Sequence, residues 1–217
     1  MAVADISIVD YESGNLYGLT RAFETIGASV RLTVDAREID AADRLVLPGV
    51  GAFGKAVQTL RAKGLVEAIQ EFAGSGRPFL GICVGMQLMM DHGTEFGHYK
   101  GLGLVSGLVD AIPKWNADGE RHPVPHIGWS PIEPAADGWA GTLLDGTAVG
   151  QEMYFLHSFA AQPAASSQVL ANTTYNNCKI VAAIQSGNMT GFQFHPEKSG
   201  ENGLAVLTTF LDRPRLA

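Results

Sequence analysis

PFLGICVGMQLMM, residues 78–90, places an apolar run, a Gly-x-Cys-x-Gly pentapeptide and a helix-like run in immediate succession. Strand, tight turn and helix in this order make a nucleophile elbow, where glycines permit the strained turn that lifts one side chain clear of the sheet. The lifted atom here is the sulfur of Cys83. A helix N-terminus favours the thiolate, which is the attacking species. The stretch therefore predicts a covalent intermediate on Cys83, rather than the inert core role that is usual for a single cysteine.

Strand-like and helix-like segments alternate before the elbow. Hydrophobic spacing predicts strands at residues 5–10, 29–34, 44–47 and 78–82, and helices at residues 16–26 and 53–72, the second broken near Gly64. This alternation is typical of a mostly parallel sheet with helices on both faces. After the elbow, short β-rich segments are predicted at residues 102–111, 124–129, 153–159, 169–175, 180–185 and 189–194, with a closing helix at 203–211. No repeat or linker interrupts the chain, so we expect one domain over residues 1–217.

Composition excludes several classes of function. The net charge is −7 and no Lys/Arg cluster occurs, which argues against nucleic acid or an anionic membrane as the partner. No window approaches the roughly 18 uninterrupted apolar residues that span a bilayer. The N-terminus lacks the basic region of a signal peptide. The two cysteines, Cys83 and Cys178, indicate no disulfide framework, and a thiol nucleophile suits a reducing cytoplasm.

A cysteine nucleophile needs a base and a group that orients the base. His195 and Glu197 stand two residues apart in an extended segment fixed by Pro196, so their side chains can point to the same side. Glu197 would then hold the imidazole in one tautomer while the other ring nitrogen faces the thiol. His195 alone would more often be a surface or core histidine, but its pairing with Glu197 favours catalysis.

A tetrahedral intermediate also needs hydrogen-bond donors for its oxyanion. The backbone amide of Val84, directly after the nucleophile, is one candidate. The turn Pro48-Gly49-Val50-Gly51 is another, because it ends the third predicted strand and would lie beside Cys83 if strands three and four are neighbours. The same turn is compatible with an ordinary strand–helix connection, and it lacks the Lys and Ser/Thr of a phosphate-binding loop.

Five motifs together resemble a known family. They are LPGVGAFG (47–54), GICVGMQ (81–87), PHIGW (125–129), YFLHS (154–158) and GFQFHPEKS (191–199). The chain resembles the class I (triad) glutamine amidotransferases and, within them, the glutaminase subunits of imidazole glycerol phosphate synthase. The resemblance runs from Asp10 to the last helix. It implies a flavodoxin-like α/β fold with a β-rich, partly antiparallel C-terminal extension.

The resemblance also implies the roles of individual residues. Cys83 would attack the side-chain amide of glutamine to form a thioester, while His195, oriented by Glu197, would protonate the leaving ammonia and activate water. Oxyanion donors would come from Val50, Gly51 and Val84. Residues expected to hold the glutamine are Gly49, Gly51, Gln87, Glu95, Ser158 and Phe159. No metal or cofactor is expected, because no residue spacing resembles a metal site.

A partner is implied as well. In the family, ammonia passes into a (β/α)₈-barrel cyclase that forms imidazole glycerol phosphate and a purine precursor on the path to histidine. The positions that would face this cyclase in a heterodimer are Asn15, Trp129, Tyr154 and Lys198. We expect weak glutaminase activity from the isolated chain and strong activation by the cyclase with its ligand, because the turn at residues 48–51 is free to flip.

Departures from the family pattern leave other readings open. The N-terminal element has Glu12 where Gly is usual, Val84 replaces a common Leu, and Phe159 replaces a common Tyr. Glu12 lies near the expected docking face, and related subunits supply ammonia for the amination of surface sugars. A cysteine peptidase with the same elbow, or a non-catalytic binding module, would also carry such a turn. Gln87, Glu95 and the Pro-Gly-Val-Gly turn favour the glutaminase.

Overall fold

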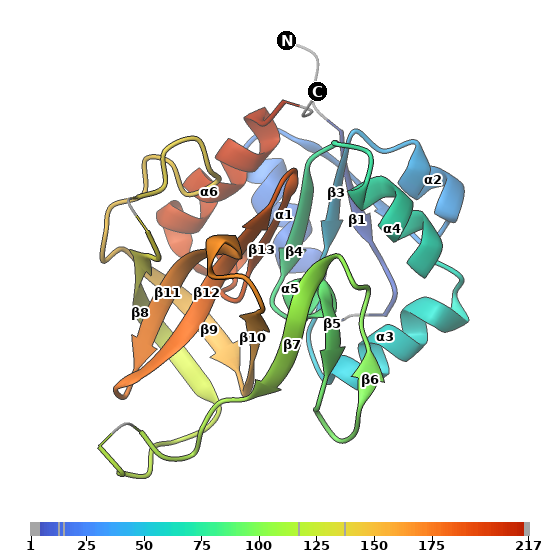
Figure 1. The fold of residues 1–217 in the computed structure, drawn as a ribbon. Helices are drawn as coiled ribbons and strands as arrows, with labels where there is room; N and C mark the ends of the chain where they lie inside the picture. The colour runs from blue at the N-terminus through green and yellow to red at the C-terminus, as the bar shows by residue number, and fades with distance from the viewer. Residues whose placement is uncertain (1–4, 13, 15, 117, 137, 215–217) are drawn as a thin grey trace.

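The computed structural model describes residues 5–12, 14, 16–116, 118–136 and 138–214. Its main sheet begins with a parallel half in the order β2-β1-β3-β4-β13 (Figure 1). The bounds of these strands are Asp5–Val9 for β1, Ser29–Thr33 for β2, Arg44–Leu47 for β3, Phe79–Ile82 for β4 and Met189–Phe192 for β13. All four pairings are parallel. Strands β3 and β4 are therefore neighbours, as the oxyanion hypothesis for residues 48–51 requires, and β13 brings the C-terminal part of the chain beside the elbow.

The same sheet continues in antiparallel pairings as β12-β11-β8-β9. Their bounds are Cys178–Ser186 for β12, Val169–Tyr175 for β11, His126–Pro134 for β8 and Glu152–His157 for β9; a short 3-10 turn at Ser166–Gln168 precedes β11. Hairpins can pair in this way without the crossover helices that parallel strands require. The predicted antiparallel extension is thus an extension of the central sheet itself.

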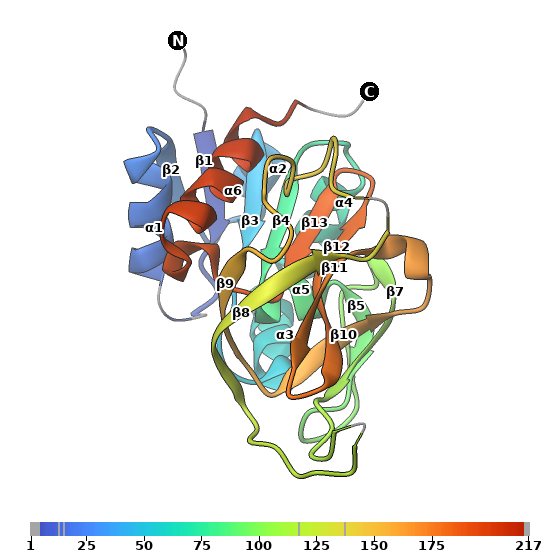
Figure 2. The ribbon, with the colours of Figure 1, turned by 90° about the vertical axis from the view of Figure 1, so that its left-hand side faces the viewer.

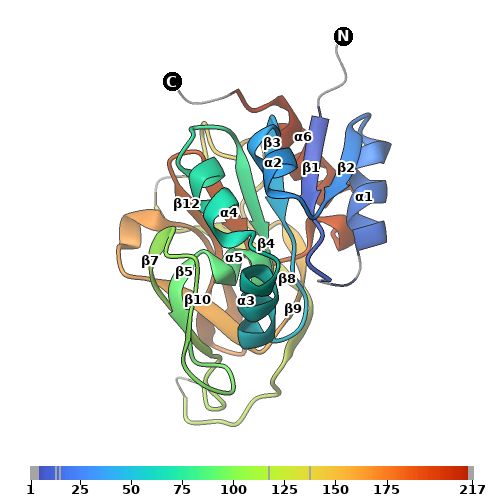
Figure 3. The ribbon, with the colours of Figure 1, turned by 90° about the vertical axis from the view of Figure 1, so that its right-hand side faces the viewer.

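Helices cover both faces of the parallel half, as the sequence predicted. Helices α1 (Leu16–Thr25) and α6 (Gly200–Asp212) pack against each other on one face (Figure 2). Helices α2 (Ala36–Asp40), α3 (Phe53–Ala62) and α4 (Val66–Ala73) lie on the other (Figure 3). Each buries its apolar stripe in one continuous core with the strands. No helix in the described ranges is long and apolar enough to cross a bilayer.

A second sheet lies over the elbow on the α3 side. Its order is β10-β7-β5-β6, with bounds Phe159–Pro163 for β10, Val105–Ala111 for β7, Met90–Gly93 for β5 and Tyr99–Lys100 for β6. The short helix α5 (Val84–Leu88) contacts β4 and β13 of the main sheet and β5 and β10 of the second one. The residues that follow the nucleophile are therefore enclosed between two sheets.

The break predicted near Gly64 is confirmed: α3 and α4 are separate helices, because the chain turns at Gly64 in the left-handed region with φ +66°. Two other predicted elements differ from the structure. The strand predicted at residues 153–159 is divided at Ser158 into β9 and β10, which belong to different sheets. Met89 and Met90 do not extend the helix after Cys83, because Met90 begins β5.

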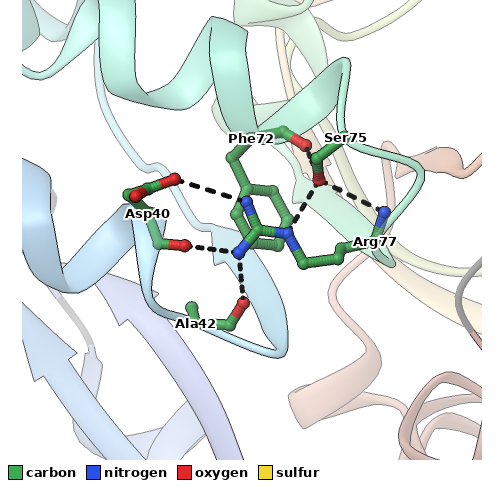
Figure 4. A network of polar contacts seen from close by, with 5 residues as sticks. All are labelled: Asp40, Ala42, Phe72, Ser75 and Arg77. Atoms are coloured by element: carbon green, nitrogen blue, oxygen red, sulfur yellow. Dashed lines mark hydrogen bonds and ion pairs between the residues drawn. The ribbon is translucent and has the colours of Figure 1, made fainter.

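Arg77 fixes the edge of the sheet that is opposite the elbow (Figure 4). It lies just before β4, its guanidinium donates to the carbonyl oxygens of Asp40 and Ala42, and it pairs with the Asp40 carboxylate. Its Nε donates to Ser75 Oγ at 2.8 Å, and its guanidinium carbon Cζ lies 4.3 Å from the centre of the Phe72 ring. These contacts fix the N-terminal ends of β3 and β4 next to each other. The C-terminal ends of the two strands therefore also lie side by side, at the elbow.

Candidate active site

The elbow at Cys83 has the predicted geometry. Cys83 adopts φ +53° and ψ −111° between β4 and α5, a strained conformation for a residue with a side chain. Its N–H donates to Phe192 O on β13 at 2.7 Å. A Cβ on Gly85 would lie 1.8 Å from Leu47 O, and one on Gly81 would lie 2.9 Å from Gly85 O. Both glycines are therefore required by close backbone contacts around the nucleophile.

The segment after β13 carries the candidate base. His195 precedes the 3-10 turn η2 (Pro196–Lys198), and its Nδ1 lies 2.8 Å from Glu197 Oε1. The His195 N–H donates to Tyr154 O at 2.8 Å, while Ser199 Oγ donates to His195 O and accepts the Tyr154 N–H. Reciprocal bonds between this segment and β9 thus fix the backbone on which the imidazole is mounted.

The electrostatics of His195 favour its protonated form. Burial by itself lowers the pKa of His195, but the hydrogen bonds and negative charge of Cys83 and Glu197 outweigh burial and raise the pKa to about 10. Within the described chain, His195 Nε2 makes no hydrogen bond of ordinary geometry, although Cys83 lies near enough to raise the pKa of His195. The free ring nitrogen is therefore the one on the side of the sulfur.

Exchanging Glu197 for Gln is expected to lower the pKa of His195 by about one to two units, because the substitution removes a negative charge and weakens a hydrogen bond to the imidazolium. The raised pKa stabilises the folded protein fully below about pH 6.5, and this stabilisation is lost as the pH rises through about 10. NMR titration of the labelled imidazole measures the shift. An unchanged midpoint in a folded Glu197→Gln variant would contradict this account of the pair.

One cavity of about 380 Å³ brings most of the predicted residues together. Those that line it are Val50, Gly51, Cys83, Val84, Gln87, Glu95, Ser158, Phe159 and His195. Two predicted residues do not line the cavity but contact residues that do. Glu197 is hydrogen-bonded to His195, and the Gly49 carbonyl accepts the Val84 N–H at 3.3 Å. A thiol, an imidazole–carboxylate pair and glycine-bearing backbone around one pocket can perform nucleophilic acyl transfer.

Comparison with known proteins identifies the family of the chain. The model of the family described as "Glutamine amidotransferase class-I" matches residues 7–213. The chain belongs to this family. "Imidazole glycerol phosphate synthase subunit HisH 1" of Legionella pneumophila (strain Lens) is 46% identical over 211 residues, covering 96% of this chain and 99% of the relative. The subunit HisH of Syntrophotalea carbinolica is 42% identical over 211 residues, covering 95% and 99%.

Solved structures share the fold of this class-I glutamine amidotransferase. PurLQS from Thermotoga maritima has a TM-score of 0.67 at 19% identity, covering 97% of this chain and 98% of that one. A structure described as a glutamine amidotransferase has a TM-score of 0.70 at 15% identity, covering 95% and 97%. The flavodoxin-like α/β architecture predicted from the sequence is confirmed by these neighbours.

The glycine-bearing turn of this amidotransferase is held by a residue that the sequence analysis did not single out. The Tyr11 hydroxyl donates to Pro48 O at 2.8 Å, and burial, with the charge of Cys83 added, raises the pKa of Tyr11 above its usual range. A Cβ on Gly49 would lie 2.6 Å from the same hydroxyl. Because the Val84 N–H donates to Gly49 O, the turn must rotate before the Val84 N–H can donate to an oxyanion.

Glu95 has a structural contact as well as a place in the cavity. Its Oε2 accepts the N–H of Phe53, the first residue of α3, at 2.7 Å. Helix α3 has no side-chain cap from Ala52, so the carboxylate supplies the partner that the helix terminus needs. This bond fixes the carboxylate beside the pocket, where it can receive a cationic group.

Two buried histidines lie next to the cavity. His157 Nε2 is 3.0 Å from His126 Nδ1, and His126 Nε2 is 2.8 Å from Ser130 Oγ. Burial lowers the pKa of His157 to about 3 and that of His126 to about 4, so both are neutral at physiological pH. The sequence analysis gave them no chemical role, and only the fold shows that they form a chain ending at the pocket wall.

The predicted docking residues that the structure describes lie together on the β8–β9 hairpin and beside it. Trp129 is half exposed and pairs across the strands with Tyr154, their rings 6.0 Å apart. The Lys198 ammonium lies 5.6 Å from the centre of the Tyr154 ring. Asn15, the fourth predicted docking residue, lies outside the described residues.

Proposed function

We propose that this chain is the glutaminase subunit of an imidazole glycerol phosphate synthase and acts in histidine biosynthesis. The observation that carries the proposal is the cavity in which the elbow thiol of Cys83 meets the His195–Glu197 pair. Relatives aligned over nearly the full length of the chain are named as HisH subunits of that synthase, which favours this function over an amidotransferase that serves surface sugars.

The reaction follows from the groups in the cavity. The Cys83 thiolate attacks the side-chain carbonyl carbon of glutamine, and the C–N bond breaks as protonated His195 gives its proton to the leaving ammonia. Neutral His195 then takes a proton from water, which attacks the thioester and releases glutamate and the thiolate. Glu197 stabilises the imidazolium in both steps. The sum is glutamine and water giving glutamate and ammonia.

Substrate placement is proposed from the same wall. Glu95 is suited to the α-ammonium of glutamine, because its carboxylate is fixed at the pocket by Phe53 N–H. Gln87 and the backbone of Ser158 and Phe159 supply neutral polar groups for the rest of the substrate. Val50, Gly51 and Val84 are proposed as oxyanion donors once the turn has rotated.

A cyclase partner is proposed on the β8–β9 hairpin. Ile127 pairs with Leu156 and Trp129 with Tyr154, which places four apolar or aromatic side chains in a ladder that is largely exposed. Leu156 also lines the cavity, so the ladder starts at the site where ammonia is released. A patch of this kind is typical of a protein interface. Docking there would also keep ammonia from becoming the non-nucleophilic ammonium ion in water.

The test is a coupled assay with a purified (β/α)₈-barrel cyclase. We expect glutamine-dependent formation of imidazole glycerol phosphate only when both proteins are present, and one glutamate per product. Glutamine hydrolysis without nitrogen transfer to that cyclase would instead support a different acceptor. Activity on peptides with none on glutamine would support a peptidase and contradict the proposal.

A further inference from the structure

A completely buried glutamine contacts the nucleophile. Gln193 follows β13 directly, and its backbone N–H donates to Ala182 O at 2.9 Å. Its side-chain Nε2 donates to Cys83 Sγ at 3.7 Å, within hydrogen-bond range for sulfur. Its Oε1 accepts from Gln87 Nε2 at 3.0 Å, and Gln87 Nε2 also donates to Phe159 O at 2.8 Å. The sulfur is thus the end of a continuous chain of buried amides.

The carbonyl of Phe159 determines which end of each amide faces the next. A carbonyl oxygen only accepts, so Gln87 must present its NH₂ group to Phe159 O. The second hydrogen of that NH₂ group points at Gln193, which must therefore present Oε1. Only the NH₂ group of Gln193 remains for the sulfur. The order of contacts alone requires a donor, and not an acceptor, to face Cys83.

A second chain ends on the same carbonyl and agrees with this assignment. His157 Nδ1 lies 2.9 Å from Phe159 O, so the proton of neutral His157 is on Nδ1 and its Nε2 accepts. His126 Nδ1 must then donate to His157, and the Ser130 hydroxyl must donate to His126 Nε2. Both lone pairs of Phe159 O are used, which fixes this carbonyl at the corner between the two sheets.

The surroundings of Cys83 Sγ explain why a side-chain donor matters. His195 lies near the sulfur without an ordinary hydrogen bond, and the other hydrogen bond of the sulfur within the described residues is to Leu156 O at 3.8 Å, an acceptor that suits a thiol and disfavours a thiolate. Helix α5 has only five residues, so its dipole offers less to a thiolate than that of a long helix would. Among the described residues, the titratable groups near the sulfur or around its cavity are His195 with its partner Glu197, Tyr11, His157 and Glu95.

We propose that Gln193 is a further catalytic residue, whose Nε2–H, aimed by Gln87 and Phe159 O, stabilises the Cys83 thiolate for attack. A hydrogen bond to a charged acceptor is stronger than one to a neutral group, so this donor acts mainly on the ionised sulfur. Its effect on turnover rests on the proposed glutaminase function. Its effect on the sulfur is measurable without glutamine.

The experiment compares the pH dependence of Cys83 alkylation by iodoacetamide in Gln193→Met and in the parent protein, both carrying Cys178→Ser so that one thiol reacts. Methionine has a similar length and packs in apolar surroundings, but it donates no hydrogen bond. We expect the midpoint of the alkylation profile to rise by about one pH unit. In the complex with the cyclase, kcat/KM for glutamine is expected to fall about tenfold.

Thr190→Val is the matched control, because Thr190 is a buried polar residue of β13 that lines no part of the cavity. Its alkylation profile is expected to match the parent's. Gln193→Glu is a second test variant, since it keeps the acceptor for Gln87 and replaces the donor by an oxygen. The midpoint of its alkylation profile should rise at least as far as in Gln193→Met. An unchanged midpoint in a folded Gln193 variant overturns the inference. A raised midpoint without any glutaminase activity in the parent would overturn the proposed function alone.

Discussion

Glutamine hydrolysis is expected to fall at least about 10⁴-fold when Cys83 is replaced by alanine, because no other group in the cavity can form the thioester. The measurement is glutamate release by the complex with the cyclase. Cys83 is buried and Ala is smaller, so the fold should be retained and circular dichroism should match the parent.

Two controls separate chemistry from assembly. Cys178→Ser should keep full turnover, because Cys178 contacts Trp115 and His122 and lines no part of the cavity. The Cys83→Ala complex should still form imidazole glycerol phosphate when ammonium salts are added at alkaline pH, since the partner then receives ammonia from solution. Retained glutamine turnover in Cys83→Ala would refute the mechanism.

The second large effect on the rate of glutamine hydrolysis is expected from the position of the turn formed by residues 48–51. The isolated chain should hydrolyse glutamine about 10²- to 10³-fold more slowly than the complex with ligand-bound cyclase, which is the usual effect of losing an oxyanion donor. The reason is the bond from Val84 N–H to Gly49 O, which turns a candidate donor away from the cavity. Steady-state rates with and without the partner measure the ratio, and equal rates would contradict this account.

A pair of substitutions at Val50 tests the turn directly. Val50→Pro removes a backbone N–H that is proposed to face the oxyanion, so activation by the partner should be largely lost. Val50→Ala keeps the N–H and removes only the exposed part of the side chain, so activation should persist. Equal activation of the two variants would show that another group stabilises the oxyanion.

The elbow could be predicted from the sequence because its requirements are local. Gly81 and Gly85 flank Cys83, and each occupies a place where a Cβ would collide with backbone. The apolar run that follows, residues 86–90, was less informative about secondary structure, since a short run fits a helix or a strand equally well. Met90 pairs with Val105 in the second sheet, a choice that depends on distant residues. Likewise, alternation over residues 153–159 could not show that Ser158 separates strands of two different sheets.

The candidate triad could be proposed from the sequence because its members stand in short motifs, whereas the residues that contact them could not. Tyr11 holds Pro48 across 37 positions, and Gln193 reaches Cys83 across 110. The first contact is set by the pairing of β1 with β3, and the second by the pairing of β13 with β4. A usable signal existed for Gln193, which stands between Phe192 and Phe194, two residues before His195. A polar residue there requires a buried hydrogen-bond partner.

The bonds between Tyr154 and the His195 segment have one further consequence. β9 is the outermost strand of the main sheet. At Tyr154 both backbone groups on this open edge are hydrogen-bonded: the carbonyl accepts the His195 N–H, and the N–H donates to Ser199 Oγ. The ring of the same residue contacts Trp129 on the face that is proposed to bind the cyclase. If the cyclase docks there as proposed, this one residue joins assembly to proton transfer, and a subunit that docks badly is expected to misplace its imidazole and hydrolyse little glutamine.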